Sequence, residues 1–184
     1  MNNPAPVVAA WCISLGTTLL GHTTLPVEKA AWANDDMSLH SFQNTQDHQH
    51  MNERGEEGMG FSQSTTSHHF LLQPAGGAIQ VAVKDSKDTI GRDHIRHHLT
   101  HIANAFANGD FDIPMFVHDT TPPGVLEMKR LRQIITYSFE KTPTGGQVVI
   151  RTSNAQALAA IHKFLRYQIV EHQTGDPLQV PSSK

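Results

Sequence analysis

The sequence predicts an α+β domain built from a duplicated ββα unit. A four-stranded antiparallel sheet would carry two main helices on one face, plus a short connecting helix. The first observation is a repeat, since HHFLLQPAGGAIQVAV from His68 aligns with YSFEKTPTGGQVVIRT from Tyr137 at a constant offset of 69 residues. The second is a Pro-x-Gly-Gly turn in each copy, where glycine supplies the positive φ that a hairpin turn needs. Because a lone hairpin and helix bury too little surface, we expect the two units to share one core.

The first helix is expected from about Thr89 to Asn108, directly after the first hairpin. Asp88 is the expected N-cap and Gly109 the expected stop, because helices favour Asp before their first turn and glycine after their last. The third observation behind the fold is the helical spacing of the apolar residues, which are Ile95, Leu99, Ile102 and Phe106.

The second helix is expected from about Asn154 to His172. Ser153 and Gln156 form a capping-box pattern at its start, and Gly175 ends it. This helix aligns with the first at an offset of 66 residues, three fewer than the hairpins. The matched pairs are Ile95 with Ile161, Leu99 with Leu165, and Gly109 with Gly175.

Other segments are expected to surround this core. Residues 122–133 predict the short connecting helix, with Pro123 in its first turn. Residues 34–67 are polar and contain histidine and methionine but little that builds a core, which indicates a flexible linker. The expected layout is an export signal (1–33), this linker (34–67), one domain (68–176, with repeats at about 68–110 and 137–176) and a disordered tail (177–184).

The N-terminal region has features of an export signal. Residues 7–20 form an apolar run too short to span a bilayer, and the AWA stretch at 31–33 fits the small-x-small pattern of a signal peptidase site. Against this, no Lys or Arg precedes Lys29. We interpret residues 1–33 as an export signal, so the expected location is periplasmic or secreted, with no integral membrane segment in the mature chain.

Composition excludes several kinds of site. The net charge is −3 with only 14 Lys and Arg, so no basic field can hold a phosphate backbone, and we expect no nucleic acid partner. We also expect no nucleotide cofactor. Cys12 is the only cysteine, which excludes an intrachain disulfide and a cysteine-based zinc or iron–sulfur site. The 13 histidines make the charge sensitive to pH between about 5 and 7.

Four histidines of the segment DHIRHHLTH (93–101) are expected on one side of the first helix. Helical periodicity places them within about 100° of one another, beside the apolar stripe, whereas Arg96 is expected to point to solvent. Two i,i+4 pairs result, the spacing at which one helix offers two imidazoles to a metal. The pairs are His94 with His98 and His97 with His101.

The second repeat lacks these histidines, so the duplicated scaffold does not need them to fold. In the helices, His97, His98 and His101 are matched by Lys163, Phe164 and Tyr167. In the first strands, His68 and His69 are matched by Tyr137 and Ser138. His162 and His172, near the apolar stripe of the second helix, are expected to be packing or edge residues.

We expect a transition-metal site in which two or three helix histidines are joined by a ligand from elsewhere. His118 is the first outside candidate, and His68 follows because strand alternation places it on the side facing the helices. Histidine with methionine suits copper, and histidine with carboxylate suits zinc. The expected metal ligands are drawn from His94, His97, His98, His101, His118, His68 and Met115.

Three functions follow as alternatives. The first is an exported carrier or buffer of copper or zinc. The second is a metal-independent module that binds a ligand or a partner, either a second copy or another exported protein, with a pH-responsive histidine surface. The third is a metal-assisted hydrolase, for which Asp93, Asp110 and Asp119 are the available general bases. No nucleophile motif such as GxSxG occurs, so we expect no catalytic residue set.

The stretch from Met59 to Asp176 resembles a family of small, exported, histidine-rich bacterial proteins. The motifs that carry the resemblance are MGFSQ and HHF (59–70), RDHIRHHLTHI (92–102), PMFVHDTTPPG (114–124) and AIHKFLRYQIVEHQTGD (160–176). They span about two thirds of the chain. The resemblance implies export and a single domain, and it carries over no activity, cofactor or catalytic residue.

Overall fold

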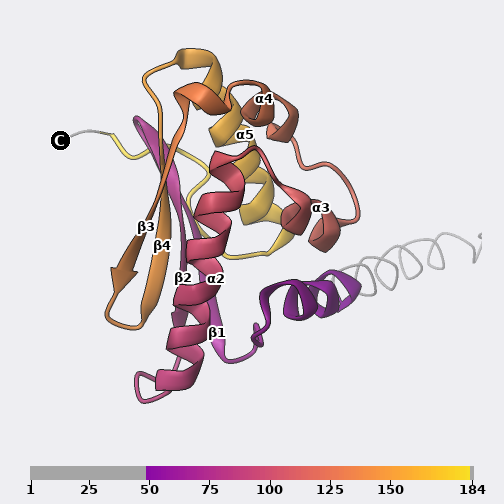
Figure 1. The fold of residues 1–184 in the computed structure, drawn as a ribbon, viewed down its shortest axis with the longest axis vertical. Helices are drawn as coiled ribbons and strands as arrows, with labels where there is room; N and C mark the ends of the chain where they lie inside the picture. The colour runs from indigo at the N-terminus through magenta and orange to yellow at the C-terminus, as the bar shows by residue number, and fades with distance from the viewer. Residues whose placement is uncertain (1–48, 183–184) are drawn as a thin grey trace, which may run out of the picture.

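The α+β fold is confirmed in a computed structural model, which describes residues 49–182. Four strands form one antiparallel sheet, and two long helices cover one of its faces (Figure 1). The export signal, Cys12 and residues 34–48 lie outside the described residues. The elements are β1 (Thr66–Gln73), β2 (Gly76–Val83), α2 (Thr89–Ala107), α3 (Asp112–His118), α4 (Val125–Arg130), the 3-10 turn η2 (Arg132–Ile134), β3 (Thr136–Thr142), β4 (Gly145–Arg151) and α5 (Ala155–Glu171).

The strand order is β1-β2-β4-β3, so the second strands of the two hairpins lie side by side in the centre of the sheet. Ile79 of β2 pairs with Val148 of β4, and these two residues are matched positions of the repeat. An approximate twofold axis therefore passes through this pair and relates the two hairpins.

Glycine is required after both hairpin turns, for different reasons. Gly76 has the predicted positive φ, at 149°. Gly145 does not belong to the positive-φ glycines, so that part of the prediction is wrong. It is needed instead because a Cβ there would lie 2.1 Å from the carbonyl oxygen of Val81 on the neighbouring strand.

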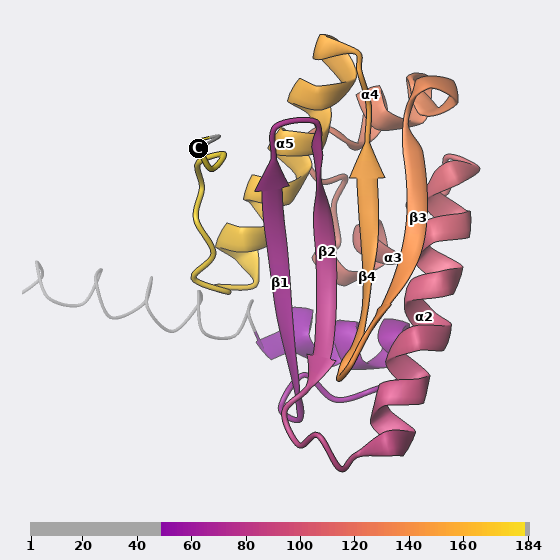
Figure 2. The ribbon, with the colours of Figure 1, turned by 90° about the vertical axis from the view of Figure 1, so that its left-hand side faces the viewer.

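Each main helix packs on the hairpin of the other repeat. The helix α2 follows the first hairpin but lies mainly against β3 and β4, whereas α5 follows the second hairpin and lies against β1 and β2 (Figure 2). The core between the helices and the sheet therefore draws on both repeats at once, as the sharing of one core required.

The helix α2 follows its prediction closely at its start and on its buried side. The carboxylate of Asp88 accepts a hydrogen bond of 2.8 Å from the backbone N–H of Gly91, which confirms this N-cap. The buried residues are the predicted apolar stripe with one alanine: Ile95, Leu99, Ile102, Ala103 and Phe106.

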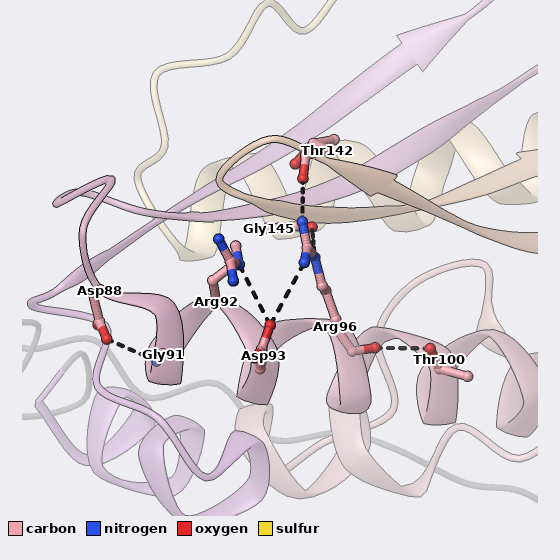
Figure 3. A network of polar contacts seen from close by, with 8 residues as sticks. All are labelled: Asp88, Gly91, Arg92, Asp93, Arg96, Thr100, Thr142 and Gly145. Atoms are coloured by element: carbon pink, nitrogen blue, oxygen red, sulfur yellow. Dashed lines mark hydrogen bonds and ion pairs between the residues drawn. The ribbon is translucent and has the colours of Figure 1, made fainter.

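Arg96 does not point to solvent as expected. Its Nε donates to the carbonyl oxygen of Gly145 at 3.0 Å and its Nη2 to that of Thr142 at 2.8 Å (Figure 3). Asp93 lies 3.6 Å from the same guanidinium. A long side chain at the edge of a helix can reach the turn that the helix packs against, so Arg96 holds the β3–β4 turn onto α2.

Two helix starts differ from the capping prediction. At α5 the N-cap is Asn154 rather than Ser153, and its Oδ1 accepts hydrogen bonds of 3.0 Å from the backbone N–H groups of Gln156 and Ala157. At α4 the N-cap is Gly124, so Pro123 precedes the helix. Both neighbouring residues at the α5 start are good caps, and the register of the helix on the sheet selects between them.

Two segments form helices that their composition did not predict. Residues 49–59 of the predicted linker form a helix, in which Met51 is 5% exposed and Arg54 donates to the carbonyl oxygen of Val117 at 3.0 Å. Residues 112–118 form the unexpected helix α3. A few apolar contacts on one side of a polar segment are enough to dock it, and composition alone does not reveal them.

Up to residue 182, the C-terminal segment runs along β1, whereas the sequence predicted a disordered tail from residue 177. The carboxylate of Asp176 accepts a hydrogen bond of 2.9 Å from the backbone N–H of Phe70. Its other oxygen lies 2.9 Å from Nδ1 of His69. Arg166 donates to the carbonyl oxygen of Leu178 at 2.8 Å, and Val180 packs against the core. This segment covers an edge strand, whose unpaired backbone groups otherwise invite association.

Candidate functional site

A cavity of about 80 Å³ lies between α2, α5 and the helix-facing side of β1 and β2. The helix α3 and Met59 border it on the remaining side. Its walls are almost entirely apolar, because the side chains from the sheet and the two helices are those of the core, among them Ile79, Val81, Leu99 and Phe164.

Four imidazoles also line this cavity, and we call them the histidine cluster: His68 on β1, His98 on α2, His118 at the end of α3 and His172 at the C-cap of α5. The ring centroid of His172 lies 6.5 Å from that of His68 and 5.1 Å from that of His118. Phe61 contacts the other two members of the cluster, since its ring centroid lies 6.1 Å from that of His68 and 5.5 Å from that of His98.

Three imidazoles of the cluster, those of His68, His98 and His118, have a lowered pKa and so favour their neutral form. Burial, together with the nearby His98, His69 and Lys84, lowers the pKa of His68 to about 4. Burial, with His101 and His97 beside it, lowers the pKa of His98 to about 4 as well. At neutral pH the cavity therefore presents uncharged imidazoles to whatever enters it.

His118 is fixed by a hydrogen bond from its ring. Its Nε2 lies 3.0 Å from Oε1 of Gln168, a buried residue of α5. Burial lowers the pKa of His118, and the hydrogen bond to Gln168 offsets this in part.

Among residues 49–182, Nδ1 of His118 and Nε2 of His68 are buried without a hydrogen-bond partner. A buried polar atom without a partner costs about 1–3 kcal/mol, so such atoms indicate a site that something else completes.

The approximate twofold axis gives an internal comparison for the cluster. With the offsets of 69 for strands and 66 for helices, His68 corresponds to Tyr137, His98 to Phe164 and His172 to Phe106. These three counterparts pack together, with ring centroids of Phe106 at 5.8 Å from Tyr137 and 6.1 Å from Phe164. The approximate twofold axis thus relates two positions. One holds an aromatic cluster, and the other holds imidazoles beside a cavity.

The histidine face of α2 divides between two hollows. His94, His97 and His101 are exposed and line a separate open groove of about 510 Å³. Residues 58–60, which include Met59, also line this groove. Of the four histidines on α2, His98 alone lines both this groove and the cavity, and the two hollows also share Met59 and Ile113. The groove and the cavity therefore meet at His98 and Met59.

The other predicted site residues lie elsewhere. Met115 packs against the core and lines neither hollow. The three aspartates considered as general bases, Asp93, Asp110 and Asp119, also line neither hollow. Within residues 49–182, no three histidine, cysteine, aspartate or glutamate side chains are grouped so as to hold a metal ion.

Three residues that line the cavity were missed from the sequence: His172, Gln168 and Met59. Phe61, whose ring lies beside His68 and His98, was missed as well. The repeat contained a signal for the first two, because the 66-residue offset matches His172 with Phe106 and Gln168 with Ile102, both core residues. His162 does have the expected packing role, since its Nε2 lies 3.0 and 2.9 Å from the carbonyl oxygens of Gln73 and Gly76 in the first turn.

Among the described residues, no helix has the length and apolarity required to cross a bilayer. Comparison of the chain with protein-family models, curated proteins and solved structures finds no match. The family resemblance drawn from the motifs therefore stays a prediction.

Proposed function

We propose that the domain binds a small, largely apolar molecule in the cavity beside the histidine cluster. The observation that carries this proposal is the difference between the two halves. At one of the two matched positions Phe106, Tyr137 and Phe164 pack together, and at the other the smaller imidazole rings leave space, which Phe106 and Phe164 also border. A scaffold that folds with aromatic packing at one copy has no structural need for buried imidazoles at the other.

The walls favour a single planar ring as the bound group. Phe61 and Phe70 flank the cluster, with the ring of Phe70 at 5.5 Å from His172, and aromatic faces stabilise aromatic ligands in stacked or edge-on arrangements. An apolar cavity of about 150 Å³ holds benzene in another protein. The cavity here is smaller but opens at His98 towards the groove, so a ring with a short substituent is the expected size.

The test replaces two imidazoles of the cluster by the residues at their matched positions in the other repeat. The variant of the full chain is His98→Phe/His172→Phe, which has phenylalanine at both positions, as the matched positions Phe164 and Phe106 do. It should lose binding of single-ring compounds in calorimetry or NMR titration. It should also be more stable to urea by about 1–2 kcal/mol, because apolar rings replace buried imidazoles.

The matched control is His101→Tyr, which copies Tyr167 at an exposed position outside the cavity. This variant should bind like the unmodified protein. Equal affinity in the double variant and the unmodified chain would overturn the cavity as the binding site.

We also propose metal binding in the open groove as a second candidate function. It is supported by the groove that His97, His101 and Met59 line together, because two imidazoles with one thioether suit copper. Titration of the full chain with Cu(I) and Zn(II) tests it. The His97→Ala/His101→Ala and Met59→Leu variants should each weaken copper binding at least tenfold. Unchanged copper affinity in the double variant would contradict the proposal.

A further inference from the structure

We propose that the molecule bound in the cavity carries a hydroxyl or N–H group that donates a hydrogen bond to Nδ1 of His118, as phenol would. This inference rests on the proposed binding function and specifies the chemical class of the ligand. It follows from the hydrogen bonds around His118 rather than from the shape of the cavity.

The hydrogen bond to Gln168 determines which ring nitrogen of His118 carries the proton. An amide oxygen only accepts hydrogen bonds, so Nε2 of His118, 3.0 Å from Oε1, must be the donor. In a neutral imidazole the other nitrogen then has no hydrogen. Nδ1 of His118 is therefore an acceptor, and it is buried without a partner among the described residues.

Gln168 lies in the second repeat, and the matched position of the first repeat holds an apolar residue. It is 4% exposed, and its counterpart Ile102 belongs to the core. A buried amide at this position is not required by the fold, and its contact with His118 gives it a positioning role. Gln168, like the histidine cluster, therefore differs in kind from the residue at its matched position, and it orients His118.

The remaining unpaired atoms select among ligands. Nε2 of Gln168 and Nε2 of His68 are also buried without a partner in the described part of the chain. The amide nitrogen only donates, so it suits an oxygen atom of the ligand. A hydroxyl both donates and accepts, whereas an ether, ketone or nitrile only accepts and a hydrocarbon does neither.

The experiment compares three single-ring probes on the full chain: phenol, toluene as its isostere without a donor, and benzonitrile as a ring with an acceptor alone. Phenol is expected to bind at least tenfold more tightly than either, because a site built around a hydroxyl rejects analogues that lack it. In Gln168→Ile, which copies Ile102, this preference should shrink to less than threefold while toluene still binds.

A second measurement reads the proton directly. The ¹⁵N chemical shifts of the His118 ring in the free protein should show Nε2 protonated and Nδ1 unprotonated, and Gln168→Ile should mix the two tautomers. Protonated Nδ1, or toluene and benzonitrile binding as tightly as phenol, would overturn the donor inference and leave the cavity function standing. Failure of all three probes to bind would overturn the proposed function with it.

Discussion

At the scale of single residues, the unusual feature is a pair of imidazoles that stay neutral well below the ordinary histidine pKa. Burial is the largest cause of the lowered pKa at both His68 and His98, and His98 adds repulsion at His68, which comes from a different element. The groups that face them from the surrounding elements are His69 and Lys84 for His68, and His97 and His101 for His98.

The first prediction concerns stability against pH. Below pH 6.5 the unfolded chain takes up protons at His68 and His98, whereas the folded chain does so only near pH 4. The unfolded state thus binds more protons in this window, and the free energy of unfolding should fall as the pH is lowered from 6.5 to 4. The loss is at most about 3 kcal/mol per residue, from about 1.4 kcal/mol per unit of pKa.

Urea unfolding at several pH values measures this loss. The His68→Tyr/His98→Phe variant, which copies the other half, should show a flatter profile between pH 4 and 6.5. The prediction fails if that variant loses as much stability over this window as the unmodified chain.

At the scale of elements, the C-terminal segment is held to β1 mainly by one carboxylate. Burial alone would raise the pKa of Asp176, but the hydrogen bonds from Thr174, the Phe70 backbone and His69 outweigh it and lower this pKa. The stabilisation is therefore present above the ordinary value of about pH 4 and is lost as the pH falls through the lowered pKa.

The second prediction is that Asp176→Ala lowers the free energy of unfolding by about 1–3 kcal/mol at pH 7, because it removes charge-assisted hydrogen bonds to the edge strand. Hydrogen exchange should also speed up at the Phe70 amide. The matched control is Glu127→Ala, an exposed carboxylate on α4, which should change stability by less than about 0.5 kcal/mol. Equal effects of the two substitutions would show that Asp176 does not hold the segment.

Elements with a strong local pattern were predictable, and those placed by tertiary contacts were not. The repeat predicted four strands and their hairpins, and Asp88 with the apolar stripe predicted α2. The helix over residues 49–59 depends on docking against α3, and Arg96 on a turn distant in sequence. Four histidines were visible on α2, but only the folded chain separates His98, at the cavity, from the three exposed ones.

At the scale of the whole molecule, the exchange of helices between the two repeats makes each half depend on the other. A fragment ending at residue 120 would retain α2 without β3 and β4, against which this helix mainly packs. The apolar stripe of α2 would then face water.

The third prediction is that a chain split into fragments 1–120 and 121–184 yields two unfolded pieces that fold when mixed. Far-ultraviolet circular dichroism and NMR dispersion should show native structure only in the equimolar mixture. A fragment that folds cooperatively alone would contradict the dependence inferred from the packing.

The approximate twofold axis has a consequence for how such a protein can vary. Two identical half-chains joined as a homodimer would present every substitution twice, so opening one cavity would also disrupt its mirror copy. In a single chain the two copies mutate separately. The aromatic cluster of Phe106, Tyr137 and Phe164 can keep its packing and stabilise the domain. The histidine cluster can meanwhile be substituted one residue at a time, with no matching substitution in the aromatic cluster.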